Sequence, residues 1–217
     1  QVFEEVKEMG DQALCLTLSS KLSGTYQSTK IAAEDYEDCV KIVDSENVCI
    51  GELILVELAV RLRDAGKTLE EMVRILNEEK KHIHVVALLD TLEYLKKGGR
   101  ITPAAAALGT VLNLKPVLQI QGEKLDAFAK VRGIKAAKKK MLEAIDKDLS
   151  SRFAGQKVNI DIAYTCSEED AAVWVDEVKA KFPEYVEDMH VDKLSLSVSC
   201  HIGAGSVAIT CTKVTEA

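Results

Sequence analysis

Hydroxyl groups and a glycine gather at Ser23, Gly24 and Thr25, between an apolar segment at residues 13–18 and a helix-compatible segment at residues 26–33. If a helix begins at Ser23 or Gly24, its first backbone N–H groups lack internal partners and point outward at the positive end of the helix dipole. Such a helix start can bind a carboxylate or a phosphate. The same residue types also form an ordinary N-cap without any ligand. The spacing alone leaves both interpretations open.

Short apolar segments alternate with amphipathic ones in the first part of the chain. Strands are expected at residues 13–18, 40–44 and 84–89. Helices are expected between them, and Thr68 with Glu71 three residues later forms a capping box for one of these. Strands that alternate with helices predict a parallel sheet covered on both faces, whose ligands gather at the carboxyl ends of the strands. The Ser23 loop lies at such an end.

The pattern changes beyond Asp90, and we therefore expect two domains, at residues 1–92 and 93–217. In the second part strands are expected at residues 115–120, 124–130, 158–164, 194–200 and 207–211. A lysine-rich helix with an apolar face is expected at residues 134–149, and Ser167 is the predicted N-cap of another helix. Both parts are thus of the α/β class.

Composition narrows the classes of partner. The 217 residues are 47% hydrophobic and carry a formal charge of −7, with acidic and basic residues interspersed. This charge balance argues against binding to nucleic acid. No apolar stretch approaches the length that spans a bilayer, so stable membrane insertion is not expected. The sequence predicts a soluble, cytoplasmic protein.

The six cysteines show neither a Cys-x-x-Cys pair nor a recurrent metal-ligand spacing, so no metal and no cofactor are expected. They are interpreted as reduced, mostly buried thiols. Cys200 is followed by His201, but successive side chains on a strand point to opposite faces, which disfavours a cysteine–histidine catalytic pair.

Two segments resemble nucleotide sites without meeting their requirements. Gly66-Lys67-Thr68 imitates the end of a P-loop, yet Arg61 stands where its first glycine should be and a helix, not a strand, leads into it. Residues 203–205 supply two glycines of a dinucleotide motif but neither the third glycine nor a following helix. No ATP site is expected.

Four motifs together resemble the DegV family of fatty-acid-binding proteins. They are SKLSGTYQS at residues 20–28, LDTLEYLKKGGRI at 89–101, LKPVL at 114–118 and HIGxG at 201–205. The resemblance implies a parallel α/β/α sheet domain followed by a second α/β domain with a mixed sheet. It also implies that a long-chain fatty acid is held between the domains. In that bacterial family the acid is presented to a separate fatty acid kinase subunit that makes acyl-phosphate, so the chain would be a carrier and not a catalyst.

This resemblance assigns roles to individual residues. Ser23, with the amides of Gly24 and Thr25, would bind the carboxylate; His201, beside Gly203, could donate one more hydrogen bond, and Arg100 would supply positive charge. The acyl chain would lie against Ala104, Leu108, Val111, Leu112, Val117, Leu118 and Ile120. Burial of about 14 methylenes at roughly 0.8 kcal/mol each gives about 11 kcal/mol before the cost of association. The tail would therefore dominate affinity and the head group would set orientation.

Other readings stay open for the same residues. Arg100 could close a turn or pair with Glu93, and His201 could be a hydrogen-bonded structural histidine. An enzyme of acyl or phosphoryl transfer that uses His201, or a regulatory module filled by lipid, are the alternative functions. Ala204 stands where the family commonly has proline. The family's first strand and an upstream threonine precede the first residue, so an N-terminally truncated piece is expected.

Overall fold

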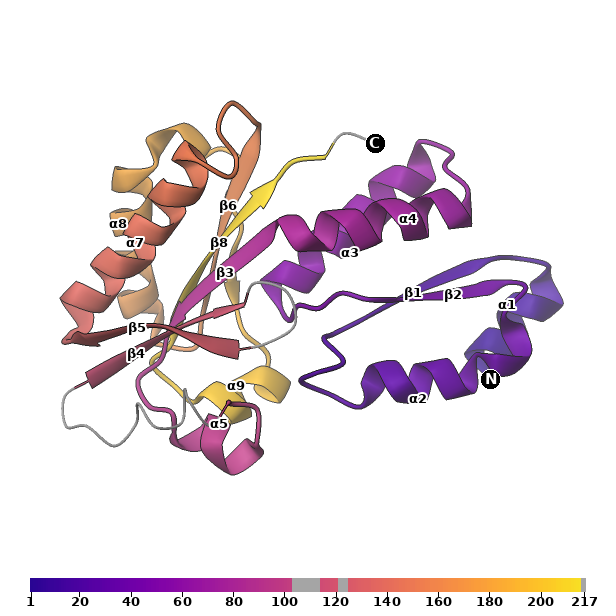
Figure 1. Cartoon of the computed structure of the whole chain (residues 1–217), viewed down its shortest axis with the longest axis horizontal. Coiled ribbons are helices and arrows are strands. Elements are labelled where there is room, and N and C mark those ends of the chain that lie inside the picture. Colours follow the sequence, from indigo (N-terminus) through magenta and orange to yellow (C-terminus); the bar gives the residue numbers. More distant parts are fainter. Residues whose placement is uncertain (103–113, 121–124, 216–217) are drawn as a thin grey trace. The chain divides into compact units, whose positions relative to one another are not determined.

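The computed structural model describes residues 1–102, 114–120 and 125–215 (Figure 1). These residues form two compact units, one of residues 1–82 with 215 and one of residues 83–214. Residues 83–92, which we expected in the first domain, lie in the second unit because their strand is hydrogen-bonded into its sheet.

The first unit is built around two parallel strands. Its elements are α1 (Val2–Met9), β1 (Ala13–Thr17), α2 (Thr25–Ala32), η1 (Glu34–Tyr36), β2 (Val40–Asp44), α3 (Ile50–Asp64), α4 (Leu69–Glu79) and η2 (Lys80–His82). Strands β1 and β2 pair in parallel from Ala13↔Val40 to Thr17↔Asp44. The expected strands and the helices that follow them are confirmed, whereas the sequence analysis assigned no element at α1.

Caps and apolar faces explain the two longest helices of this unit. Helix α4 begins with the predicted capping box, in which Thr68 Oγ1 accepts from the Glu71 N–H and the Glu71 carboxylate accepts from the Thr68 N–H. Helix α3 buries Leu55, Leu58 and Leu62 on one face. Each buried leucine contributes about 1.5–3 kcal/mol of transfer free energy, so this face fixes the helix against its unit.

The second unit contains a mixed sheet. Its elements are β3 (Ile83–Leu88), α5 (Glu93–Gly98), β4 (Leu114–Ile120), β5 (Leu125–Arg132), α7 (Ile134–Ser150), β6 (Val158–Tyr164), α8 (Glu168–Lys181), η4 (Pro183–Tyr185), β7 (Val191–Lys193), α9 (Leu196–Ile202) and β8 (Val207–Lys213). The described strands run in the order β5-β4-β3-β8-β6-β7. Only β6 and β7 pair in parallel among these neighbours, and the other pairs are antiparallel.

Two strand assignments need correction. The strand near residues 84–89 was expected in the parallel sheet, but β3 lies between β4 and β8 and is antiparallel to both. A central strand of either kind is apolar on both faces, so its sequence does not name its partners. Residues 194–200 were expected to be a strand, but Ser195 is the N-cap of helix α9. The alternation of serine with apolar residues there does not mark a buried face, because Leu196 is 86% exposed.

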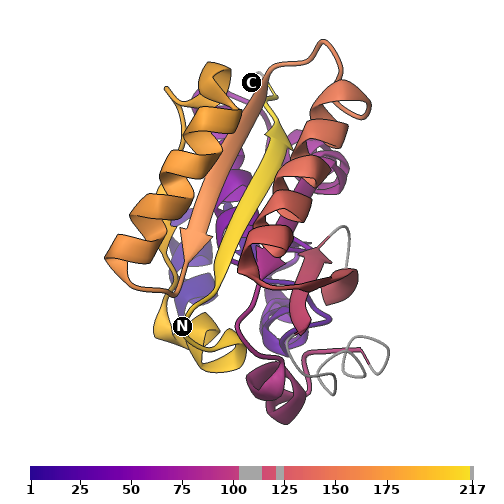
Figure 2. The same cartoon turned by 90° about the vertical axis from the view of Figure 1, so that its left-hand side faces the viewer.

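Helices α7 and α8 pack against the same face of the mixed sheet, as Figure 2 shows for strands β6 and β8. Trp174 of α8, Met141 of α7 and Ile160 of β6 are completely buried there. Ser167 caps α8 as predicted, since its Oγ accepts from the Asp170 N–H at 3.1 Å. The core of this unit therefore lies between the sheet and the two helices.

The fold is the expected mixed α/β class, with a small parallel sheet followed by a larger mixed one. None of the helices in the described ranges combines the length and the apolar character that a bilayer crossing requires.

Candidate functional site

The Ser23 loop begins helix α2 in the first unit. Gly24 is the N-cap and the helix begins at Thr25. The hydroxyls of Ser23 and Thr25 lie 2.8 Å apart on the surface, and the Thr25 N–H donates to Ser23 Oγ at 3.2 Å. The two predicted hydroxyls are therefore brought together.

Backbone amides of this helix start are partly open. The N–H groups of Gly24, Tyr26 and Gln27 have no acceptor among the residues that the structure describes. We expected the amides of Gly24 and Thr25 to bind the anion, but the Thr25 amide is already occupied by Ser23 Oγ. The open donors are thus the predicted Gly24 amide and the amides of Tyr26 and Gln27, in the first turn where unpaired helix N–H groups normally lie.

The end of β2 holds this loop in place. The Asp44 carboxylate accepts from the Ser20 N–H at 3.2 and 3.3 Å and from the Glu46 N–H at 3.0 Å. The Ser19 N–H donates to the Asn47 carbonyl at 2.8 Å. The sequence analysis missed the role of Asp44, although an aspartate at the carboxyl end of a parallel strand is a signal for it.

In the second unit Arg100 and His201 meet at Gly98. Arg100 is exposed, and its Nη1 donates to the Gly98 carbonyl at 2.5 Å. A Cβ placed on Gly98 would lie 2.8 Å from His201 Nδ1. Arg100 does close a turn, as one alternative proposed, and Glu93 pairs with Lys97 instead. The His201 ring makes no hydrogen bond within the described part of the chain, so the structural alternative has no support.

Gly203 ends helix α9 with φ 79° and ψ 174°, a backbone conformation that favours glycine. Its carbonyl accepts from Thr165 Oγ1 at 2.7 Å, and the Ser206 N–H donates to the same Thr165 Oγ1 at 3.0 Å. On another side, a Cβ on Gly203 would lie 2.7 Å from two ring carbons of Tyr94. The loop after His201 is therefore held by Thr165 and by Tyr94, neither of which the sequence analysis identified.

Lys115, on strand β4, pairs with the carboxylate of Asp90, which follows strand β3. Lys115 Nζ lies 2.5 Å from Asp90 Oδ1, and the Asp90 Cβ lies 3.3 Å from the position of a Cβ on Gly205. Because Asp90 is paired, its negative charge is largely compensated and opposes an incoming anion less.

The predicted acyl-chain residues divide between two faces of the sheet. Leu118 packs with Leu89, Leu92 and Leu95, whereas Val117 belongs to the core under α7 and α8. Val117 packs under α7 and α8 and not with Leu118, and this position, not its burial, corrects its assignment to the pocket. Ile120 is also buried. Ala104, Leu108, Val111 and Leu112 lie outside the described residues.

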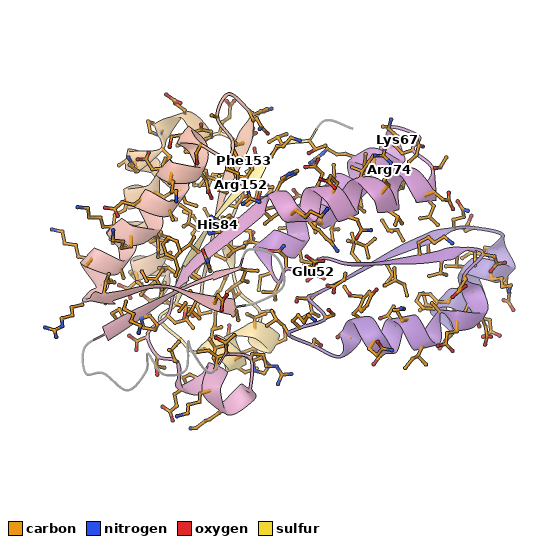
Figure 3. All side chains as sticks on the ribbon, viewed as in Figure 1. Glu52, Lys67, Arg74, His84, Arg152 and Phe153 are labelled. Carbon is orange, nitrogen blue, oxygen red and sulfur yellow. The ribbon has the colours of Figure 1, made fainter. Side chains whose placement is uncertain are left out.

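Thiol chemistry and metal binding find no support in the described ranges. Burial, and next the charge of Glu52 (Figure 3), raises the pKa of Cys49 to about 12, and the same causes raise the pKa of Cys15. Both thiols therefore stay protonated at neutral pH. Cys200 Sγ donates to the Ser197 carbonyl rather than to a base. No group of three metal-ligating side chains occurs among the described residues.

Comparisons with known proteins point to one family. A family model described as an uncharacterised protein of the DegV family matches residues 1–214. A DegV domain-containing protein of Clostridium perfringens is 35% identical over 96% of this chain and 72% of its own length. A solved structure described as fatty acid binding of a DegV family protein from Thermus thermophilus has a TM-score of 0.87 and 33% identity, over 98% of this chain and 75% of that one. The structure of DegV, a fatty acid binding protein from Bacillus subtilis, has a TM-score of 0.81 and 27% identity, over 98% and 75%.

Proposed function

The chain belongs to the DegV family, and from that premise we propose that it binds a long-chain fatty acid and acts as a lipid-binding carrier. The similar structures from Thermus thermophilus and Bacillus subtilis are described as fatty acid binding. One observation of this chain's own residues carries the proposal. Arg100 and His201 meet at Gly98, and each is followed directly by an isoleucine that packs against one apolar cluster.

The polar half of this arrangement suits a carboxylate. The Arg100 guanidinium supplies positive charge and the His201 ring supplies a hydrogen-bond donor, which together bind a carboxylate more strongly than neutral donors do. We propose that the hydroxyl of Ser23 and the open amides of α2 also bind a carboxylate. Ser23→Ala should then weaken palmitate binding, and an unchanged affinity would contradict this role.

The apolar half suits an acyl chain. Ile101 and Ile202 are partly buried against the cluster of Leu89, Leu92, Leu95 and Leu118. An amphipathic ligand whose charged end lies at Arg100 and His201 therefore meets apolar side chains one residue further along both segments. Leu118 and Ile120 are the described residues of the predicted pocket that we retain for the tail.

We further propose that the bound acid is presented to a separate fatty acid kinase subunit for acyl-phosphate formation. A separate kinase is consistent with the P-loop-like segment at residues 66–68, which is not built as an ATP site. Thr68 is the N-cap of α4, and helix α3 precedes it. A P-loop instead needs a strand before it and a glycine-rich turn. We propose that the chain has this role in the bacterial cytoplasm. Its six cysteines are free thiols, and cysteines of cytoplasmic proteins are usually reduced.

The first experiment is a titration of delipidated protein with palmitate by calorimetry. Arg100→Met and His201→Ala should each weaken binding about tenfold, the loss of one charge-assisted hydrogen bond. Lys96→Ala is the matched control, because it removes a positive charge from an exposed position of the same region. No binding by the unsubstituted protein would contradict the function, and unchanged affinity in both variants would contradict the site.

The second experiment concerns the partner. A fatty acid kinase subunit with ATP should form acyl-phosphate from palmitate faster when this chain is present, whereas the chain alone should not consume ATP. ATP consumption by the chain alone that His201→Ala abolishes, with palmitate binding retained, would favour the enzyme alternative.

A further inference from the structure

We propose that helix α5 positions the His201 imidazole for the ligand, through Gly98 beneath the ring and Tyr94 beneath the following loop. This inference rests on the proposed function and adds to it two positioning residues, Tyr94 and Gly98. They act through His201 and Gly203 rather than by contact with the fatty acid.

The two residues lie on one face of the same helix. Tyr94 and Gly98 are four positions apart on α5, which places them one above the other. Tyr94 faces Gly203 and Gly98 faces His201. A single helical face therefore lies against the last turn of α9 and its cap, in agreement with the contact between these two helices.

Close packing determines which nitrogen of His201 stays open. The position of a Cβ on Gly98 lies 2.8 Å from Nδ1 and 3.5 Å from Cε1, and its third neighbour is Arg100 Cδ at 3.9 Å. Nε2 is therefore at least as far away as that third neighbour. With Nδ1 against the helix, Nε2 is the ring nitrogen left for a ligand.

Functional histidines usually have their second nitrogen held by a carboxylate or a carbonyl, which fixes both tautomer and orientation. The His201 ring has no such partner within the described part of the chain. Van der Waals contact with α5 takes over the orienting role. This explains why glycine stands at position 98, since any side chain would displace the ring.

Gly98 also links Arg100 and His201, the two residues proposed to bind the head group. Its carbonyl accepts from Arg100 Nη1 at 2.5 Å, while its α-carbon faces His201. A change at this residue therefore shifts Arg100 and His201 together. Tyr94 packs against the α-carbon of Gly203, whereas the Thr165 hydroxyl holds the Gly203 carbonyl at 2.7 Å. Loss of the Tyr94 ring removes the first of these two contacts.

The experiment compares palmitate with hexadecan-1-ol, which has the same chain length and no carboxylate. Gly98→Ala and Tyr94→Ala should weaken palmitate binding about tenfold, while hexadecan-1-ol affinity changes less than about twofold. Tyr94→Phe keeps the ring carbons that contact Gly203 and should bind palmitate as the unsubstituted protein does. Lys96→Ala, on an exposed position of α5, is the second control.

A second readout needs no ligand. The imidazole 15N and 13C resonances of His201 in the free protein should shift in Gly98→Ala and Tyr94→Ala, and stay in place in Tyr94→Phe and Lys96→Ala. If Gly98→Ala does not fold, the tyrosine pair decides the question, because Tyr94 is 46% exposed.

The outcomes separate the two proposals. Unmoved His201 resonances in both alanine variants, or equal losses for palmitate and hexadecan-1-ol, would overturn the positioning role and leave fatty acid binding intact. Failure of the unsubstituted protein to bind palmitate would overturn the proposed function, while the resonances would still report whether α5 orients the ring.

Discussion

His84 and Asp148 form a buried pair that resembles a catalytic dyad, and we predict that its role is structural (His84 is labelled in Figure 3). His84 Nδ1 on β3 lies 2.5 Å from Asp148 Oδ2 on α7, and Gln119 Oε1 lies 3.3 Å from His84 Nε2. The side chains of His84 and Asp148 are 5% and 13% exposed. The pair therefore ties the end of α7 to the middle of the sheet, where water can replace little of the interaction.

The perturbation is Asp148→Ala. A hydrogen bond to a charged group contributes about 1.5–3 kcal/mol, and its loss leaves a buried imidazole without that partner. A loss of about 2 kcal/mol corresponds to a fall of roughly 6 °C in Tm, at about 3 °C per kcal/mol for a chain of this size. Asp148→Asn keeps a neutral acceptor of the same shape and should lose less.

Trp174 makes the assay specific to one unit. It is the only tryptophan of the chain, lies in the second unit and is completely buried. Its fluorescence during urea denaturation therefore follows the unit that contains the pair. The exposed pair Glu93–Lys97 supplies a control, because Glu93→Ala should leave the urea midpoint nearly unchanged. An unchanged urea midpoint in Asp148→Ala would refute the structural role. If palmitate binding were lost at the same time, the pair would have a functional role instead.

Three further predictions concern the first unit, each measured by circular dichroism during denaturation. Gly51→Ala should destabilise it by at least about 1 kcal/mol, because the new Cβ would overlap Asn47 Oδ1; an unchanged midpoint would contradict this contact. Burial raises the pKa of Glu52 above its ordinary value of 4.5, so the native state binds the proton more tightly and loses stability as pH rises. Glu52→Gln should therefore stabilise the unit at pH 7, with a gain that disappears below about pH 4.5; a gain independent of pH would exclude this cause. Thr68→Ala should cost about 1 kcal/mol through loss of the N-cap, and an unchanged midpoint would contradict the capping box.

Elements with local signals were predictable from the sequence. The capping box at Thr68 and the N-cap at Ser167 identified helix starts to the residue, because each signal consists of groups within one helical turn. Strand β6 has the predicted bounds, although it is buried along nearly its whole length and not on one face only as its alternation predicted. Local hydrogen bonding and periodicity suffice for such elements.

The sequence did not predict which strands pair with each other or which distant residues lie close together. Strand β3 was assigned to the wrong sheet because an apolar run does not encode the strands beside it. In the same way, no local pattern predicts that Arg100 lies near His201, because strands β4 to β7 separate the two residues in the sequence. The packing of α5 against α9 brings them together.

The division between Val117 and Leu118 could have been made from the sequence. Successive residues of a strand point to opposite faces, so these two could not both line one pocket. The structure places Val117 under α7 and α8 and Leu118 with the leucines of α5 and its approach. Since Ile101 and Ile202 contact the Leu118 cluster and directly follow Arg100 and His201, a tail that follows the proposed head group must lie on the Leu118 face. Substitutions at Val117 should then affect the stability of the core, whereas substitutions at Leu118 should also change the affinity for the acyl chain.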